Sequence, residues 1–161
     1  MKIRIDWQEP ILVARHKKLE QDWQTKADAI EGRAGVYFFA RQHGTKRIPF
    51  YIGESVNLRR RLEQLMKTAA IMDVLRSLKD GGDKNIRQGA RYFHYGYLAT
   101  ARGQNAKSCL AVVQRHMIET AMAAGYPILN KQLTAMPTHE LMFDGSPLAR
   151  GIYAKTSRPR R

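Results

Sequence analysis

Residues 34–62 read AGVYFFARQHGTKRIPFYIGESVNLRRRL, and this stretch decides the fold. Its first part, 34–40, is apolar, aromatic and β-branched, which is typical of a buried strand. A polar turn follows at 41–47. The segment 48–53 then reads as a second strand, with its proline near the start, where proline disturbs pairing least. The stretch therefore predicts an antiparallel hairpin, followed by a helix that begins at Asn57.

Further elements follow from the same kind of pattern. They are a helix at 71–78, a glycine-containing loop at 79–90, an aromatic strand at 91–99 and an amphipathic helix at 105–124 that Gly125 ends. The order strand, strand, helix, strand, helix predicts an α+β fold. We expect a small antiparallel three-stranded sheet flanked by helices.

The two ends of the chain read differently from the middle. Residues 2–7 alternate between charged and apolar side chains and predict a short strand, whereas 11–30 has helical spacing and Pro10 suits the start of a helix. We therefore expect three parts: a largely helical N-terminal extension at 1–33, a central domain at 34–130 and an irregular basic tail at 131–161.

Charge indicates the kind of partner. The 161 residues include 28 Lys and Arg against 14 Asp and Glu, a formal net charge of +14 with a pI near 10.3. This length suits one domain that buries roughly 70% of its unfolded surface. The excess of positive charge points to nucleic acid first and to an anionic membrane surface second. A merely basic or ribosome-associated protein is the alternative.

Cysteine content and hydropathy favour a cytoplasmic protein. Cys109 is the single cysteine, which excludes a disulfide within the chain and zinc sites built on two or four cysteines. The first seven residues lack the apolar run of a signal peptide. No segment approaches the roughly 18 apolar residues of a transmembrane helix. We therefore expect no membrane partner.

Five elements recur in an order that resembles a known family. They are Gly35-Val36-Tyr37, Tyr51-Ile52-Gly53, Arg61, Glu119 and Asn130. The ordered set resembles the GIY-YIG nucleases, which include homing endonucleases, the N-terminal nuclease of bacterial excision repair and some restriction enzymes. The resemblance covers about residues 35–130 and implies metal-dependent hydrolysis of DNA phosphodiester bonds by direct water attack.

The resemblance also implies a role for each residue. Tyr37, assisted by Tyr51, would activate water, Arg61 would hold the scissile phosphate, and Glu119 would bind Mg²⁺ or Mn²⁺. The supporting residues would be Gly35, Gly53, Asn57, Asn130 and His116. Flanking phosphates would meet Lys46, Arg47, Arg59 and Arg60.

Each of these residues also has a plainer interpretation. Strand tyrosines are usually core or surface aromatics, Glu119 would form an ion pair with Arg115, and Asn130 would lie in a turn. A phenol has an unperturbed pKa near 10, so a tyrosine needs a nearby cation to act as a base.

The base itself stays open. Several GIY-YIG nucleases carry His or Tyr one turn after the arginine, where this chain has Leu65. Proton transfer would then fall to Tyr37 alone, or to His43 or His94. A literal Gly-Ile-Tyr at 151–153 has no second tripeptide after it, and we read it as a chance match.

We therefore expect a DNA endonuclease. The alternatives are a catalytically silent nucleic-acid-binding module of the same fold and a basic RNA-associated structural protein. The substrate form stays open between duplex, single-stranded and branched DNA, and RNA. Because one active site cuts one strand, cleavage of both strands would need a homodimer or two visits.

Overall fold

The computed structural model describes residues 2–15, 18–76, 89–99 and 103–130, and the strand pair at 141–142 and 156–157. The helices are α1 (Trp23–Asp28), α2 (Leu58–Leu65), α3 (Ala69–Leu75) and α4 (Ala106–Ala123). The strands are β1 (Arg4–Trp7), β2 (Ile11–Arg15), β3 (Lys18–Leu19), β4 (Gly35–His43), β5 (Lys46–Ser55), β6 (Arg91–Ala99), β7 (Leu141–Met142) and β8 (Thr156–Ser157). Predictions for most of 79–90, for most of the tail with Gly151-Ile152-Tyr153, and for the His43 side chain lie outside the described residues.

The predicted hairpin forms the centre of an antiparallel sheet. Strand β4 pairs with β5 on one side and with β6 on the other, so Tyr37 lies opposite both Gly53 and Tyr95. The sheet has six strands rather than the three expected, in the order β3-β2-β6-β4-β5, and β1 also pairs with β6. The α+β class is confirmed, but the size of the sheet was underestimated.

The additional strands come from the N-terminal extension, where the predicted helix at 11–30 is wrong. Only Trp23–Asp28 is helical there, while Ile11–Arg15 forms β2 along the outer edge of β6. Ile11 and Val13 are buried, and both are β-branched. The open edge of β6 offers a row of backbone partners, which outweighs the helical spacing of this segment. Pro10 separates β1 from β2 instead of starting a helix.

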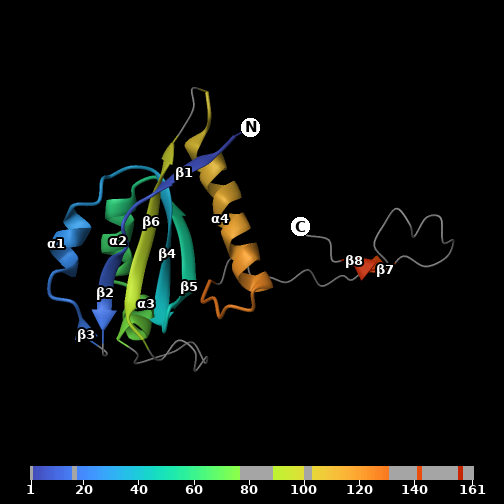
Figure 1. Ribbon diagram of the computed structural model, residues 1–161. Coiled ribbons are helices and arrows are strands. Elements are labelled where there is room, and N and C mark those ends of the chain that lie inside the picture. Colours follow the sequence, from blue (N-terminus) through green and yellow to red (C-terminus); the bar gives the residue numbers. More distant parts are fainter. Residues whose placement is uncertain are drawn as a thin grey trace.

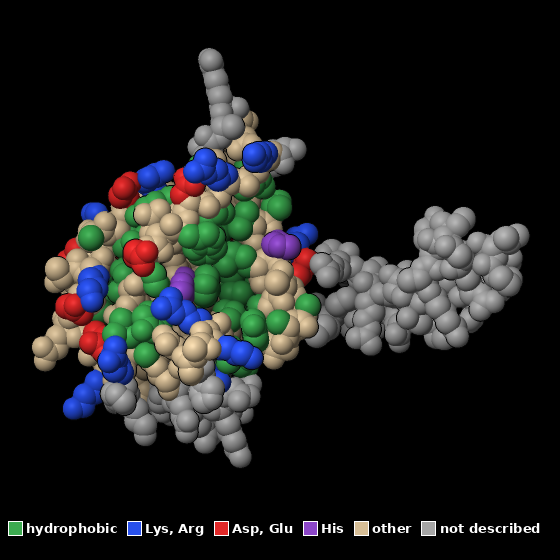
Figure 2. Space-filling view, viewed as in Figure 1, with side chains coloured by type: hydrophobic (Ala, Val, Ile, Leu, Met, Phe, Trp, Pro, Cys, Tyr) green, Lys and Arg blue, Asp and Glu red, His purple; other side chains and the backbone are tan. Residues whose placement is uncertain are grey.

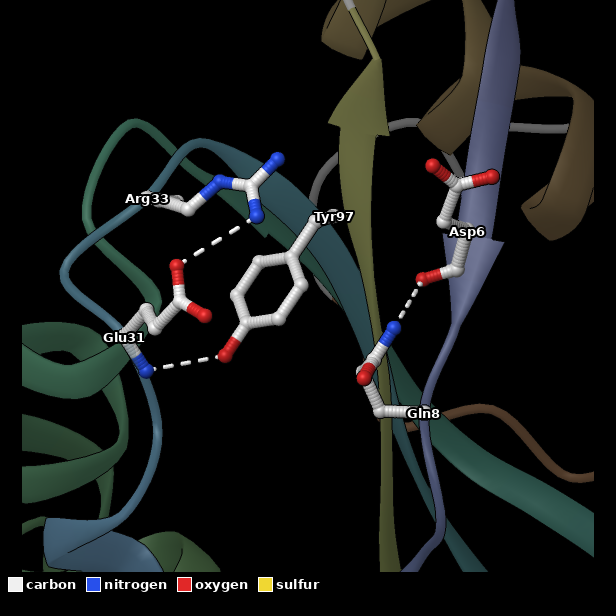
Figure 3. A network of polar contacts seen from close by, with 5 residues as sticks. All are labelled: Asp6, Gln8, Glu31, Arg33 and Tyr97. Carbon is white, nitrogen blue, oxygen red and sulfur yellow. Dashed lines mark hydrogen bonds and ion pairs between the residues drawn. The ribbon is translucent and has the colours of Figure 1, made fainter.

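Polar contacts tie this extension to the sheet. The Tyr97 hydroxyl of β6 accepts a hydrogen bond from the Glu31 backbone N–H at 2.8 Å, as Figure 3 shows. The Arg33 guanidinium lies 4.7 Å from the centroid of the Tyr97 ring and 3.3 Å from the Glu31 carboxylate. The extension is therefore part of the same fold as the hairpin.

The helices cover opposite faces of the sheet (Figure 1). Tyr37 and Phe39 point to one face, where they pack with Leu58 and Leu62 of α2. Ile52 points to the other face and packs with Ile118 and Ala121 of α4. This alternation follows from the twofold side-chain period of a strand.

Local signals explain the two longer helices. The Asn57 side chain caps α2 by accepting from the Arg60 N–H at 3.0 Å, and Leu65 is buried in the core. Asn105 caps α4 in the same way, and Gly125 follows its end with a φ of 72°, a conformation that favours glycine. In the described part of the chain, no helix is both long and apolar enough to cross a bilayer.

Candidate functional site

Two aromatic side chains meet on the face of the sheet that α2 covers. Tyr37 is 1% exposed, and its hydroxyl lies over Gly53 of the neighbouring strand. A Cβ at Gly53 would overlap that hydroxyl, so this glycine is required for the close approach. The half-buried Tyr51 ring lies 6.4 Å from the Tyr37 ring, measured between centroids. The structure therefore brings together three residues of the predicted tripeptides.

Arg61 joins this pair from α2. Its Nε donates a hydrogen bond to the Tyr37 hydroxyl at 3.0 Å. Burial lowers the Arg61 pKa, but hydrogen bonding to Tyr37 and the proximity of Tyr51 outweigh it, so the net pKa is raised. Arg61 therefore stays charged and is held in one orientation, with its side chain only partly buried. We call Tyr37, Tyr51 and Arg61 the tyrosine–arginine cluster.

The electrostatics of Tyr37 differ from what a general base requires. Burial raises its pKa above 10, and the neighbouring Arg61 offsets only part of that increase. The phenol is therefore neutral at pH 7 and almost without solvent contact. In this state the Tyr37 hydroxyl accepts the hydrogen bond from Arg61 and helps to orient the guanidinium.

Two of the predicted supporting residues hold α2 against the sheet. A Cβ at Gly35 would overlap the Gly96 carbonyl oxygen and come within 2.6 Å of Leu58, so glycine lets the first turn of α2 approach. Asn57 caps that turn. Both residues thus fix the helix that carries Arg61.

Asn130 fixes the outer edge of β5. Its Oδ1 accepts from the Ile52 N–H at 3.0 Å, and its Nδ2 donates to the Ile52 carbonyl. The Leu129 N–H also donates to the Phe50 carbonyl at 2.7 Å. The segment after α4 therefore continues the backbone pairing beside Tyr51.

Glu119 and His116 lie elsewhere. Met117 and Ala121 pack toward the sheet, and Glu119 is two residues from each, which is about 200° around the helix. Glu119 lines a groove on the outward face of α4 with Arg115 and His116. This helix covers the sheet face opposite the tyrosine–arginine cluster, so the structure does not bring Glu119 to Tyr37 and Arg61.

This placement bears on the expected metal. Mg²⁺ and Mn²⁺ bind carboxylate oxygens, and the predicted carboxylate is across the sheet from the cluster. Among the described residues there is also no group of three or more His, Cys, Asp and Glu side chains that could hold a metal ion. The described residues therefore do not fit a divalent ion at the cluster.

The predicted phosphate contacts divide between structural and exposed roles. The Arg59 Nε donates to the Ile30 carbonyl at 2.6 Å and ties α2 to the segment after α1. Arg60 and Lys46 are exposed. Arg47 lies over the Tyr92 ring on the α4 face of the sheet. His94, one of the alternative bases, is on that face too, opposite Phe38.

Sequence reasoning missed two buried arginines. Arg41 and Arg91 lie directly opposite each other on β4 and β6 and are 5% and 1% exposed. Burial, followed by the charge of Arg41, lowers the pKa of Arg91 to about 10. The available signal was weak, because Arg41 lies in the predicted turn directly after the strand 34–40, whereas Arg91 begins the predicted strand 91–99.

Comparison with known proteins adds no relative. No family model matches the chain, and no curated protein or solved structure matches it either.

Proposed function

We propose that this protein is an endonuclease that hydrolyses phosphodiester bonds in DNA, in the manner of the GIY-YIG nucleases. The observation that carries the proposal is the 3.0 Å hydrogen bond from Arg61 to Tyr37, beside Tyr51 and over Gly53. The succession β4, β5, α2, α3, β6, α4 supports it as well.

In this proposal each member of the cluster has a distinct role. Arg61 binds a non-bridging oxygen of the scissile phosphate and stabilises the charge that develops there, because a guanidinium is planar and permanently charged. The half-buried Tyr51 hydroxyl donates to the phosphate or orients the attacking water. Tyr37 is a positioning residue that acts through Arg61. Water attacks phosphorus directly, without a covalent enzyme intermediate. One ester P–O bond breaks as the new one forms, the attacking water loses a proton to solvent, and the departing oxygen takes one up.

A catalytically silent nucleic-acid-binding module is the second candidate. Two observations favour it: Glu119 lies on the outward face of α4, and Tyr37 is almost fully buried. Such a module would use Arg61 to bind phosphate and would have no ion at the cluster.

One assay separates these candidates. Purified protein is incubated with labelled duplex and single-stranded DNA, in Mg²⁺ and in EDTA, beside Glu119→Gln and the matched variant Glu63→Gln on the exposed side of α2. The nuclease proposal expects cleavage by the wild type and by Glu63→Gln. If cleavage is lost in EDTA and in Glu119→Gln but is kept in Glu63→Gln, the predicted metal role of Glu119 would be restored. Binding without cleavage under every condition would support the binding module.

A further inference from the structure

A row of aromatic rings crosses the sheet on the face away from the tyrosine–arginine cluster. Trp7 of β1 lies edge-on to Phe38 of β4, with centroids 5.6 Å apart. Phe38 stacks on His94 of β6 at 4.4 Å, with the two planes 3° apart. Tyr92 continues the row 6.3 Å from His94. We call these four side chains the aromatic row.

Helix α4 leaves this part of the sheet open. Trp7 is 50% exposed, and Phe38, Tyr92 and His94 are only partly buried. Figure 2 shows hydrophobic side chains gathered in a hollow between β1 and α4, with Lys and Arg side chains along its lower border. Next to the row, Phe38 and Ile52 line an apolar cavity of about 240 Å³ with Met117 and Ala121 of α4.

Positive charge lies at one end of the row. The Arg47 guanidinium is 4.4 Å from the centroid of the Tyr92 ring, and its Nη1 is 3.4 Å from the His94 Nε2. Burial and the charge of Arg47 lower the pKa of His94 to about 4, so its imidazole is neutral at pH 7. The aromatic row therefore consists of flat, uncharged rings and has the positively charged Arg47 at one end.

This combination favours one class of occupant. Unpaired bases stack on aromatic side chains and expose a phosphate chain that cations bind, whereas the bases of a duplex are already stacked on each other. A purely apolar partner would gain nothing from Arg47, and the net charge of +14 favours a polyanion. We propose that the aromatic row is a platform for single-stranded nucleic acid, with bases stacked on Trp7 and packed against the Phe38–His94 pair, and with phosphates bound by Arg47. It lies on the opposite face of the sheet from the cluster and does not depend on cleavage there.

Tryptophan fluorescence tests this surface directly. In a Trp23→Phe background Trp7 is the only indole, and a short oligothymidylate is added in EDTA so that binding is measured apart from metal-dependent cutting. We expect the oligothymidylate to quench Trp7 emission. By anisotropy of a labelled oligothymidylate, Trp7→Ala in the wild-type background should raise Kd by about 5- to 100-fold, in line with base–aromatic stacking. Trp7→Phe should retain most of the affinity.

Two controls keep the result specific. Val112→Ala removes an exposed apolar side chain from the outward face of α4 and should leave Kd unchanged. The thermal midpoint of each variant shows whether a loss of binding reflects unfolding.

Three outcomes would overturn the platform. They are absence of Trp7 quenching, equal quenching by a duplex of the same length, and concentration-dependent dimerisation that Trp7→Ala abolishes. The last would assign the row to a second copy of the chain. Failure of the nuclease proposal would instead appear as absence of cleavage, which these binding experiments do not measure.

Discussion

At Tyr37, burial outweighs a neighbouring positive charge. Arg61 donates to its hydroxyl and favours the phenolate, yet burial raises the pKa above its ordinary value of 10. A neutral phenol accepting from a guanidinium is a rigid support for that guanidinium. In the nuclease proposal, this balance gives Tyr37 the orientation of Arg61 and gives Arg61 the contact with substrate.

This balance predicts how stability depends on alkaline pH. Because the folded-state pKa of Tyr37 is raised, its stabilising contribution is complete below pH 10 and is lost as pH rises toward the folded-state pKa. Above pH 10 the free energy of unfolding should therefore fall more steeply for the wild type than for Tyr37→Phe, as chemical denaturation would measure. Parallel pH dependence of the two proteins would contradict the raised pKa.

The lowered pKa of His94 predicts that stability falls as the pH becomes acidic, whereas Tyr37 lowers stability as the pH becomes alkaline. Its pKa is lowered from 6.5 to about 4, so the neutral ring stabilises the fold above pH 6.5, and that contribution is lost as pH falls toward 4. His94→Phe keeps a ring against Phe38 and removes the titration. Between pH 6.5 and 4 the urea midpoint should drop for the wild type more than for this variant. An equal drop in both would place the acid sensitivity elsewhere.

The sequence predicted that Tyr37, Tyr51 and Arg61 lie close together. It also indicated that Glu119 faces away from the sheet. The spacing of Tyr37, Tyr51 and Arg61 is enough to bring them together once the hairpin and its helix form. Glu119 is two residues from the apolar residues Met117 and Ala121 of its helix, a separation that already implies the outward face. The burial that raises the pKa of Tyr37 depends on packing from distant segments, which spacing alone does not show.

At the scale of elements, Asn130 connects the end of α4 to β5. The oxygen and the nitrogen of its side-chain amide both form hydrogen bonds with the backbone of Ile52. The side chain therefore pairs with β5 as the backbone of a neighbouring strand would. This contact lies at the outer edge of the strand that carries Tyr51 and Gly53.

Removing that contact should weaken the fold measurably. We expect Asn130→Ala to lower the free energy of unfolding by about 1–3 kcal/mol, because it leaves the Ile52 backbone groups without their side-chain partner. Asn130→Asp should be comparably harmful, since a carboxylate would face the Ile52 carbonyl. Urea denaturation measures both, with the exposed Gln64→Ala as control. Wild-type stability in both variants would show that the contact is dispensable.

The elements differ in how far sequence could predict them. The strands β4, β5 and β6 and the helix α4 follow from local composition, and their observed bounds lie within three residues of those expected. The segment 11–30 carries helical spacing as well as β-branched residues, and its structure is decided by the edge of β6, which is distant in sequence. Long-range pairing of this kind leaves no local pattern.

For the whole molecule, the net charge of +14 predicts binding that salt weakens. The logarithm of the association constant should fall linearly with the logarithm of salt concentration, by about 0.9 for each phosphate contact on duplex DNA and about 0.7 on single strands. Arg60→Ala should reduce the slope on duplex DNA by about 0.9, the value of one phosphate contact. Arg47→Ala should reduce the slope on single strands by about 0.7. Anisotropy titrations at several salt concentrations measure both. Slopes near zero would argue against a nucleic-acid partner.

The most direct test of the central claim is the rate at which Arg61→Ala cleaves labelled DNA under single-turnover conditions, beside the exposed matched variant Lys67→Ala. If Arg61 stabilises the charge on the scissile phosphate, its removal should slow cleavage by about 10²- to 10³-fold, while Lys67→Ala stays within a few-fold of the wild type. Cleavage by Arg61→Ala at the wild-type rate, in a protein that is still folded, would contradict the assignment of the tyrosine–arginine cluster as the active site.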